Sequence, residues 1–235
     1  MTRRSLLLVP TLLLAAPLAC SLGAQVGHIP AESPYQDLRG RQAVTFATGI
    51  LAPGKDPAGV GPRSGLVASA RYELLLTGPL WFQAKVSYAP QLERTVKDPL
   101  LTGAARDFGT SKRPFTLAEV GFGMNLTGNK SWRRVTPQLH GALGMATAGT
   151  SKFDVGGYRF GNKITVSYGL GARIVTGAAW EIDADVTHAF WKYSYPDDYR
   201  GSGGPTDVSI LGGQSLSAWK GNFQLTLGAS RFFFR

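Results

Sequence analysis

The charged residues that could do chemistry in this chain recur at every second position within apolar segments. Arg71 and Glu73 are separated by one residue, and so are Asp183 and Asp185. Residues with this spacing point to the same face of a β-strand, where they can meet charges from other strands. Such groups form either a buried ion-pair network or a path for protons or ions. The candidate residues are Arg71, Glu73, Lys85, Glu119, Arg173, Glu181, Asp183 and Asp185.

A second kind of chemistry would need a histidine and a nucleophile near a lipid interface. His188 is the one candidate, with Ser194 some way beyond it, but His188 shares its strand face with apolar residues and no His-x-Ser motif is present. We expect His140 to be a packed interior residue. The single cysteine is Cys20, and three dispersed histidines give no metal-ligand spacing. The sequence therefore predicts no catalytic residues, no metal and no cofactor.

These charged residues lie in segments where apolar and polar residues alternate with a period of two, which indicates β-strands rather than helices. Three short turns, each containing Thr-Gly and followed by Trp, alternate with long connections; the tryptophans are Trp81, Trp132 and Trp180. An even number of strands joined by alternately short and long connections is typical of a transmembrane barrel. We predict an all-β fold, an eight-stranded antiparallel up-and-down transmembrane β-barrel, with strands at 42–51, 66–76, 80–88, 116–126, 135–145, 164–174, 180–190 and 223–230.

The position of the charges favours a membrane barrel over soluble β-folds. In the central part of strands two to seven, every Asp, Glu, Lys and Arg lies on the polar face, and none interrupts the apolar face. A soluble β-sandwich usually has many charges on its outer face, and its connections are not systematically long and then short. A soluble lipocalin-type barrel, apolar inside and polar outside, shows the same alternation and stays an alternative. The many Gly, Ser and Thr residues of the polar face suit a narrow, filled lumen better.

The N-terminal region has the layout of an export signal. Arg3 and Arg4 precede an apolar run that ends in small residues, so we expect residues 1–24 to be a cleaved signal peptide. A lipid-attachment site at Cys20 is a weaker alternative. We expect 25–40 to be an extended periplasmic leader, and 41–235 to form the barrel domain.

Large aromatic residues occur near the expected strand ends, where membrane proteins place them at the headgroup level. By strand alternation Trp81 points inward, so either the turn shifts the register or Trp81 is a lumen residue. The expected interface aromatics are Tyr72, Trp81, Tyr88, Trp132, Tyr168, Trp180 and Trp219.

The formal net charge of +10 could indicate nucleic acid, but an exported chain with scattered Lys and Arg meets anionic lipid first. We expect outer-membrane lipid and lipopolysaccharide as partners, no nucleic acid, and a monomer.

The pattern over 42–235 resembles the small eight-stranded outer-membrane proteins, the family of the outer-membrane protein A barrel domain and outer-membrane protein X. The resemblance implies insertion into the bacterial outer membrane by the barrel-assembly machinery, which reads a C-terminal aromatic; here Phe234 is followed by Arg235, and Arg231 interrupts the apolar face. The leading hypothesis is a non-enzymatic barrel with a side-chain-filled lumen, whose long extracellular loops serve surface interaction or membrane integrity. A narrow channel for ions or small apolar molecules, and a lipid-modifying enzyme, are the alternatives.

Overall fold

A computed structural model of the protein describes residues 33–38, 40–150, 154–176, 180–201 and 209–233. The expected signal peptide lies outside these residues. Most of the described chain is β-strand, and no helix in it is long and apolar enough to cross a membrane. The long strands are β2 (Gln42–Ala52), β3 (Gly65–Thr77), β4 (Leu80–Lys97), β5 (Asp107–Asn125), β7 (Val135–Ala148), β8 (Gly161–Ile174), β9 (Trp180–Ser194) and β10 (Ser217–Phe233). The short elements are β1 (Tyr35–Asp37), η2 (Gly103–Arg106), β6 (Lys130–Trp132) and η3 (Asp197–Arg200).

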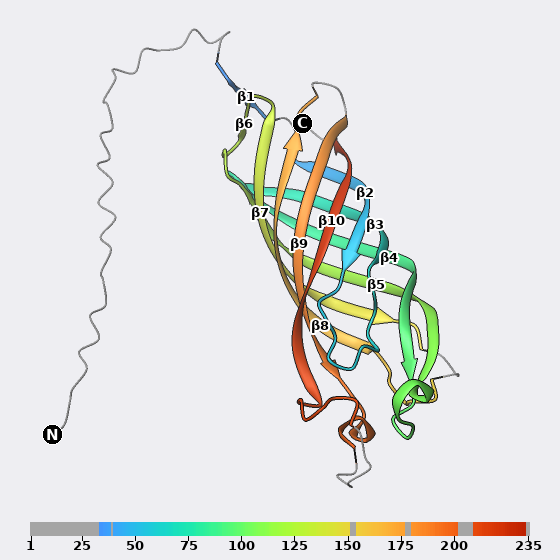
Figure 1. The fold of residues 1–235 in the computed structure, drawn as a ribbon. Helices are drawn as coiled ribbons and strands as arrows, with labels where there is room; N and C mark the ends of the chain where they lie inside the picture. The colour runs from blue at the N-terminus through green and yellow to red at the C-terminus, as the bar shows by residue number, and fades with distance from the viewer. Residues whose placement is uncertain (1–32, 39, 151–153, 177–179, 202–208, 234–235) are drawn as a thin grey trace, which may run out of the picture. The chain divides into compact units, whose positions relative to one another are not determined.

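The eight long strands close into an antiparallel barrel in the order β2–β3–β4–β5–β7–β8–β9–β10 (Figure 1). The last strand pairs with the first, from Phe223 opposite Ala52 to Phe233 opposite Gln42. Closure gives each of the eight long strands a partner on both sides, which is what a strand protein needs in a medium without water. The prediction of an eight-stranded up-and-down barrel is confirmed.

The barrel is apolar outside and polar inside. Leu143 is 61% exposed on the outer surface, whereas Ala142, its neighbour on β7, is 8% exposed and faces the lumen. The outer surface carries Phe46, Ile50, Leu66, Val120, Phe122, Leu170, Leu225 and Leu227, all at least half exposed. The lumen side carries charged and polar side chains that are nearly all buried. A soluble barrel has the opposite arrangement, so the lipocalin-type alternative does not fit.

The second long connection differs from the expected loop at 91–114. β4 continues to Lys97 and β5 begins at Asp107, so the two strands extend past the apolar belt as a paired ribbon closed by η2. The register shifts between Ala89 and Leu92, a bulge that disturbs the alternation. Outside the membrane both faces of a strand tolerate polar residues, and the period-two signal therefore fades there.

Part of the leader is also a strand. β1 pairs with β6, from Tyr35 opposite Trp132 to Asp37 opposite Lys130, and β6 joins the barrel through the pair Trp132–Val135. The leader thus becomes ordered at the end of the barrel that carries the short turns, here called the short-turn end. The opposite end, with the four long connections, is called the long-loop end.

The last strand is longer than expected and accommodates its out-of-pattern arginine. β10 runs from Ser217 to Phe233. Arg231 is exposed on the outer surface, and its guanidinium lies 5.6 Å from the ring centroids of both Trp180 and Phe233. An arginine can hold this position at the short-turn interface because its stem and aromatic neighbours stay in the apolar layer while its charge reaches the headgroups.

Candidate functional site

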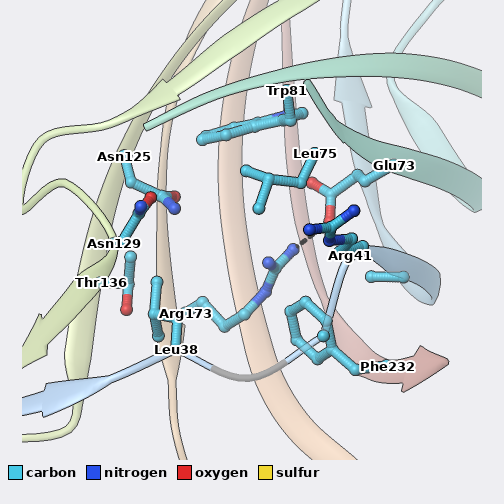
Figure 2. Close-up of a pocket in the computed structure, with 12 residues that line it drawn as sticks. Leu38, Arg41, Glu73, Leu75, Trp81, Asn125, Asn129, Thr136, Arg173 and Phe232 are labelled. Atoms are coloured by element: carbon cyan, nitrogen blue, oxygen red, sulfur yellow. Dashed lines mark hydrogen bonds and ion pairs between the residues drawn. The ribbon is translucent and has the colours of Figure 1, made fainter. Parts of the chain in front are cut away.

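The lumen near the short-turn end holds a buried set of ion pairs, the inner charge network. Arg71 on β3 contacts Glu73 on the same strand (Nε–Oε1 3.1 Å) and Asp183 on β9 (Nη2–Oδ2 2.7 Å). Arg173 on β8 contacts Glu73 (Nη2–Oε2 2.5 Å; Figure 2). It also contacts Asp183 (Nη2–Oδ2 3.3 Å). Two arginines therefore share two carboxylates across the lumen, and every one of these side chains is at least nine-tenths buried.

Asp185 links this group to the next layer of the lumen. Its carboxylate lies 3.4 Å from Lys85 Nζ and 2.6 Å from His140 Nε2. Lys85 Nζ also donates to Thr187 Oγ1 at 2.9 Å. Nδ1 of His140 lies 3.3 Å from Nε2 of Gln83. This arrangement suits a tautomer in which His140 donates from its own Nε2 to Asp185 and accepts at Nδ1 from the Gln83 amide. His140 is thus a member of the network, which its isolated position in the sequence does not indicate.

Two of the eight expected charges lie at the margin of the network. Glu181 reaches Arg173 only at 3.8 Å. Glu119 is 4% exposed and stands opposite Lys85 in register, but no ion pair joins it to a cation in the described part of the chain. The structure therefore brings seven of the predicted charges together and leaves Glu119 beside them. A stabilising role for the network stays a prediction, and so does the alternative role in proton movement.

The long-loop half of the interior is filled by apolar side chains, here called the outer aromatic cluster. Phe115, Phe160 and Trp191 are buried against one another, with ring centroids 5.6 to 6.1 Å apart. Leu92 from the β4 extension and Leu211 from the last connection are buried in the same cluster. It continues into the tyrosines Tyr158, Tyr193, Tyr195 and Tyr199. The connections therefore fold down onto the barrel and close it.

A loop carboxylate organises the first long connection against this cluster. Asp56 accepts hydrogen bonds from the backbone N–H groups of Val60 and Gly61, both at 2.6 Å, and from Ala58 at 3.1 Å. The Tyr195 hydroxyl donates to the same carboxylate. Burial raises the pKa of Tyr158 and Tyr195 above the ordinary value, and for Tyr195 the hydrogen bond to Asp56 adds to this effect. The raised pKa keeps the Tyr195 hydroxyl protonated, as its donation to Asp56 requires.

Six of the seven expected interface aromatics are exposed on the outside of the molecule: Tyr72, Tyr88, Trp132, Tyr168, Trp180 and Trp219. Trp81 is different, because it is 5% exposed and lies inside the barrel, so an interface position for it is wrong. It stands opposite Gly123 in register, and a Cβ on that glycine would come within 2.4 Å of the indole. The glycine makes room for the ring to lie across the lumen, as strand alternation alone predicts.

His188 lies among aromatic rings on the outer surface. It stacks on Phe223 with ring centroids 4.0 Å apart, and the Tyr168 hydroxyl lies 3.0 Å from its Nδ1. No hydrogen bond in the described residues joins it to a serine or a carboxylate. Ser194 lies at the far end of β9 and is exposed. In the same residues, no group of three or more His, Cys, Asp or Glu is placed to hold a metal.

The comparisons with known proteins give the fold class. No family model and no curated protein matches the chain. The solved structure of Neisserial surface protein A is similar over 82% of this chain and 97% of its own, with a TM-score of 0.52 at 10% identity. The outer-membrane protein OprG of Pseudomonas aeruginosa gives 0.50 at 9% identity, over 86% of this chain and 100% of its own. The outer-membrane enzyme PagL gives 0.40 at 12% identity, over 81% of this chain and 99% of its own.

The closed eight-stranded barrel, its apolar outer surface and the likeness to the first two structures define the class: the chain is a small outer-membrane β-barrel. In barrels of this class the short turns face the periplasm and the long loops face the exterior. The inner charge network then lies toward the periplasm, and the outer aromatic cluster toward the cell surface.

Proposed function

We propose that the protein is a non-enzymatic outer-membrane barrel that conducts nothing through its lumen and presents a fixed loop surface to the cell exterior. The observation that supports this most is the outer aromatic cluster. Phe115, Trp191 and Tyr199 are each at most 1% exposed, so they occupy the space a channel would need. The cavity beside Arg94 and Phe160 is only about 10 Å³, too small for a hydrated ion.

Below this cluster the inner charge network obstructs the lumen a second time. A conducting path would have to separate Arg71 and Arg173 from their buried carboxylates, which is costly in a site with little water. Conductance in planar bilayers tests the proposal. We expect no current steps from protein that a heat-shift gel has shown to be folded. Regular current steps that scale with the amount of protein would refute the proposal.

The outer wall near the long-loop end carries a cation beside an aromatic ring, an arrangement suited to anionic lipid. Lys192 is exposed and stands opposite the exposed Trp219 in register. An exposed lysine attracts anionic headgroups, and Trp219 supplies the ring that membrane proteins place beside headgroups. We propose that this patch contacts the phosphates of lipopolysaccharide in the outer leaflet.

Thermal stability in two kinds of vesicle tests this lipid contact. We expect Lys192→Gln to lower the unfolding temperature in vesicles that contain lipopolysaccharide and to leave it unchanged in zwitterionic phospholipid. Lys130→Gln is the matched control, because Lys130 is an exposed cation at the short-turn end. An equal effect of both substitutions in both vesicles would rule the contact out.

The proposal of a non-enzymatic role rests on the surroundings of His188. Its imidazole is stacked between rings and bonded to Tyr168, and no nucleophile lies beside it in the described residues. A lipid-modifying enzyme needs a base that can reach the proton of a nucleophile or of water. Unchanged radiolabelled phospholipid and lipopolysaccharide after incubation with the folded barrel is the expected result.

A further inference from the structure

A cavity of about 130 Å³ opens at the short-turn end of the barrel, below the inner charge network. Trp81 lies across one side of it, and Phe232 and Leu38 lie on the other (Figure 2). Trp81 is 5% exposed, whereas Arg41 and Asn129 at the rim are exposed. The cavity is therefore a vestibule, closed toward the barrel lumen and open toward the periplasm.

The vestibule is preformed, because backbone contacts hold the leader across the barrel end. The N–H of Leu38 donates to the carbonyl of Asn129 at 2.9 Å, next to the β1–β6 pairing. Gly40 has a φ of +102°, and a Cβ there would lie 2.9 Å from Phe232. Only glycine combines this conformation with so close an approach, so the wall formed by the leader is fixed by the sequence.

Two buried donors that line the vestibule have no partner. The Nε1 of Trp81 and the Oγ1 of Thr136 are inaccessible and form no hydrogen bond within the described residues. A buried donor without a partner costs free energy comparable to a lost hydrogen bond. A ligand that accepts hydrogen bonds at this wall would satisfy both groups.

The charges around the vestibule favour an anionic occupant. Arg173 is already matched by Glu73 and Asp183. No ion pair joins Arg41 to an acidic group in the part of the chain that the structure describes, although Arg41 lines the same cavity. Besides the unpartnered atoms of the ion-paired Arg173 and Glu73, the vestibule thus offers one uncompensated guanidinium and two unsatisfied donors. The side chains of Leu38, Leu75 and Phe232 supply its apolar wall.

We propose that the vestibule is a binding site for a small organic anion with a compact apolar body, entering from the periplasm. The anionic group pairs with Arg41. Because the donor atoms of Trp81 and Thr136 are covered, they reach the anion only after a small rotation of these two side chains. The apolar body packs between Leu75 and Phe232. A cavity of this size holds a molecule near the size of benzene, or about four waters.

Benzoate is the probe, because it is the smallest ligand with both a carboxylate and a ring of this size. The indole N–H of Trp81 is the reporter in two-dimensional ¹H–¹⁵N spectra of the folded barrel in detergent, assigned with Trp81→Phe. Benzyl alcohol has the same ring without the charge, and inorganic phosphate has charge without the ring. A ligand of this size binds with a Kd on the order of 1 mM, so the titration must reach well beyond that at constant ionic strength.

We expect the Trp81 indole signal to shift and saturate with benzoate, and to require at least about tenfold more benzyl alcohol or phosphate for the same shift. Arg41→Gln should weaken benzoate binding about tenfold or more, because Arg41 is the cation without a partner. Lys130→Gln, at the same end but outside the vestibule, should leave the titration unchanged.

Three results would overturn the proposal. A vestibule filled only by water gives no saturable shift with benzoate. Equal responses to benzoate and phosphate would mean that the apolar wall contributes nothing. Equal weakening by Arg41→Gln and Lys130→Gln would mean that benzoate responds to the general charge of the barrel end. None of these results depends on whether the lumen conducts, so the outcome is separate from that of the conductance test.

Discussion

The two halves of the barrel interior are filled by opposite chemistries. Toward the short turns, Arg71, Arg173 and their carboxylates form a network from strand residues alone. Toward the long loops, Phe115 and Trp191 from the strands pack against Tyr158 and Tyr199 from the connections. A narrow lumen must be filled in either case, but strands suffice for the first half, while the second half depends on the loops.

This difference predicts how the stability of each half responds to mutation. Loss of one member of the inner network leaves a buried charge without its partner, and the strands cannot move away to hydrate it. Loss of one member of the outer cluster leaves a cavity, but the connections can open toward water. We therefore expect global effects from the inner half and local effects from the outer half.

The largest expected effect is that of Arg173→Ala. It leaves Glu73 and Asp183 with one cation fewer in a buried site, at a cost of about 3–5 kcal/mol in the free energy of unfolding. The paired variant Arg173→Met with Glu73→Gln removes charge from both sides and should cost clearly less. Urea titration of the barrel in detergent, with a heat-shift gel as the readout, measures both. Equal losses would show that the network is not held by pairing.

Leu92→Ala probes the outer half. Leu92 is 2% exposed within the outer aromatic cluster. Its truncation should lower the free energy of opening the long connections by about 2–4 kcal/mol. Because the connections can open separately, we expect faster protease cleavage in the loops while the heat-shift of the barrel changes little. If the barrel unfolds as readily as with Arg173→Ala, the two halves are not distinct.

Asp56→Asn tests how the first connection is attached to the outer cluster. The substitution keeps the shape of the side chain but removes the negative charge of the carboxylate that accepts hydrogen bonds from Val60, Gly61 and Tyr195. Loss of one charge-assisted hydrogen bond should destabilise the attachment of the loop by about 1.5–3 kcal/mol. Hydrogen exchange at the amides of Val60 and Gly61 should become faster. Unchanged exchange would show that other contacts hold this loop.

Alkaline pH should loosen the outer half selectively. Burial raises the pKa of Tyr158, Tyr195 and Tyr199 above the ordinary value of 10.0. A raised folded-state pKa means that the contribution to stability is complete below pH 10 and declines as the pH rises further. For Tyr158 the decline is about 1.4 kcal/mol per pH unit.

Absorbance at 295 nm and loop proteolysis, followed together, check this pH dependence. The buried Tyr158, Tyr195 and Tyr199 should ionise only when the loops become accessible to protease. Ionisation of every tyrosine in one step near pH 10, with the loops still resistant, would contradict the burial.

The barrel was predictable because a membrane imposes one rule on every strand. Leu143 and Ala142 reach opposite faces by alternation, and the eight predicted charges all reach the lumen face in the same way. Alternation also predicts the inward Trp81, although its type suggests an interface. The bounds of the strands were less predictable, because β4 and β5 continue where lipid no longer enforces the pattern.

The features that could not be predicted depend on partners distant in sequence. The β1–β6 pairing brings Tyr35 to Trp132, and no local sequence pattern predicts this pairing. Arg133 and Arg134, in the turn after β6, have positive φ values of 48° and 68°, where Asn or Gly would signal a tight hairpin. The outer aromatic cluster combines Leu92 with Tyr199 from a different connection. His140 looks isolated in the sequence and meets Asp185 only after the barrel closes.

The central claim is that the outer surface of the barrel faces lipid, and spin-label accessibility in liposomes tests it most directly. Labels are placed at Leu143 and Leu170 on the barrel wall and at Leu100 in the second connection, all exposed positions whose replacement disturbs no buried contact. Labels at 143 and 170 should collide with oxygen and be shielded from a water-soluble nickel chelate, with the reverse at 100. Equal collision of the nickel chelate at all three positions would show that water bathes the barrel wall.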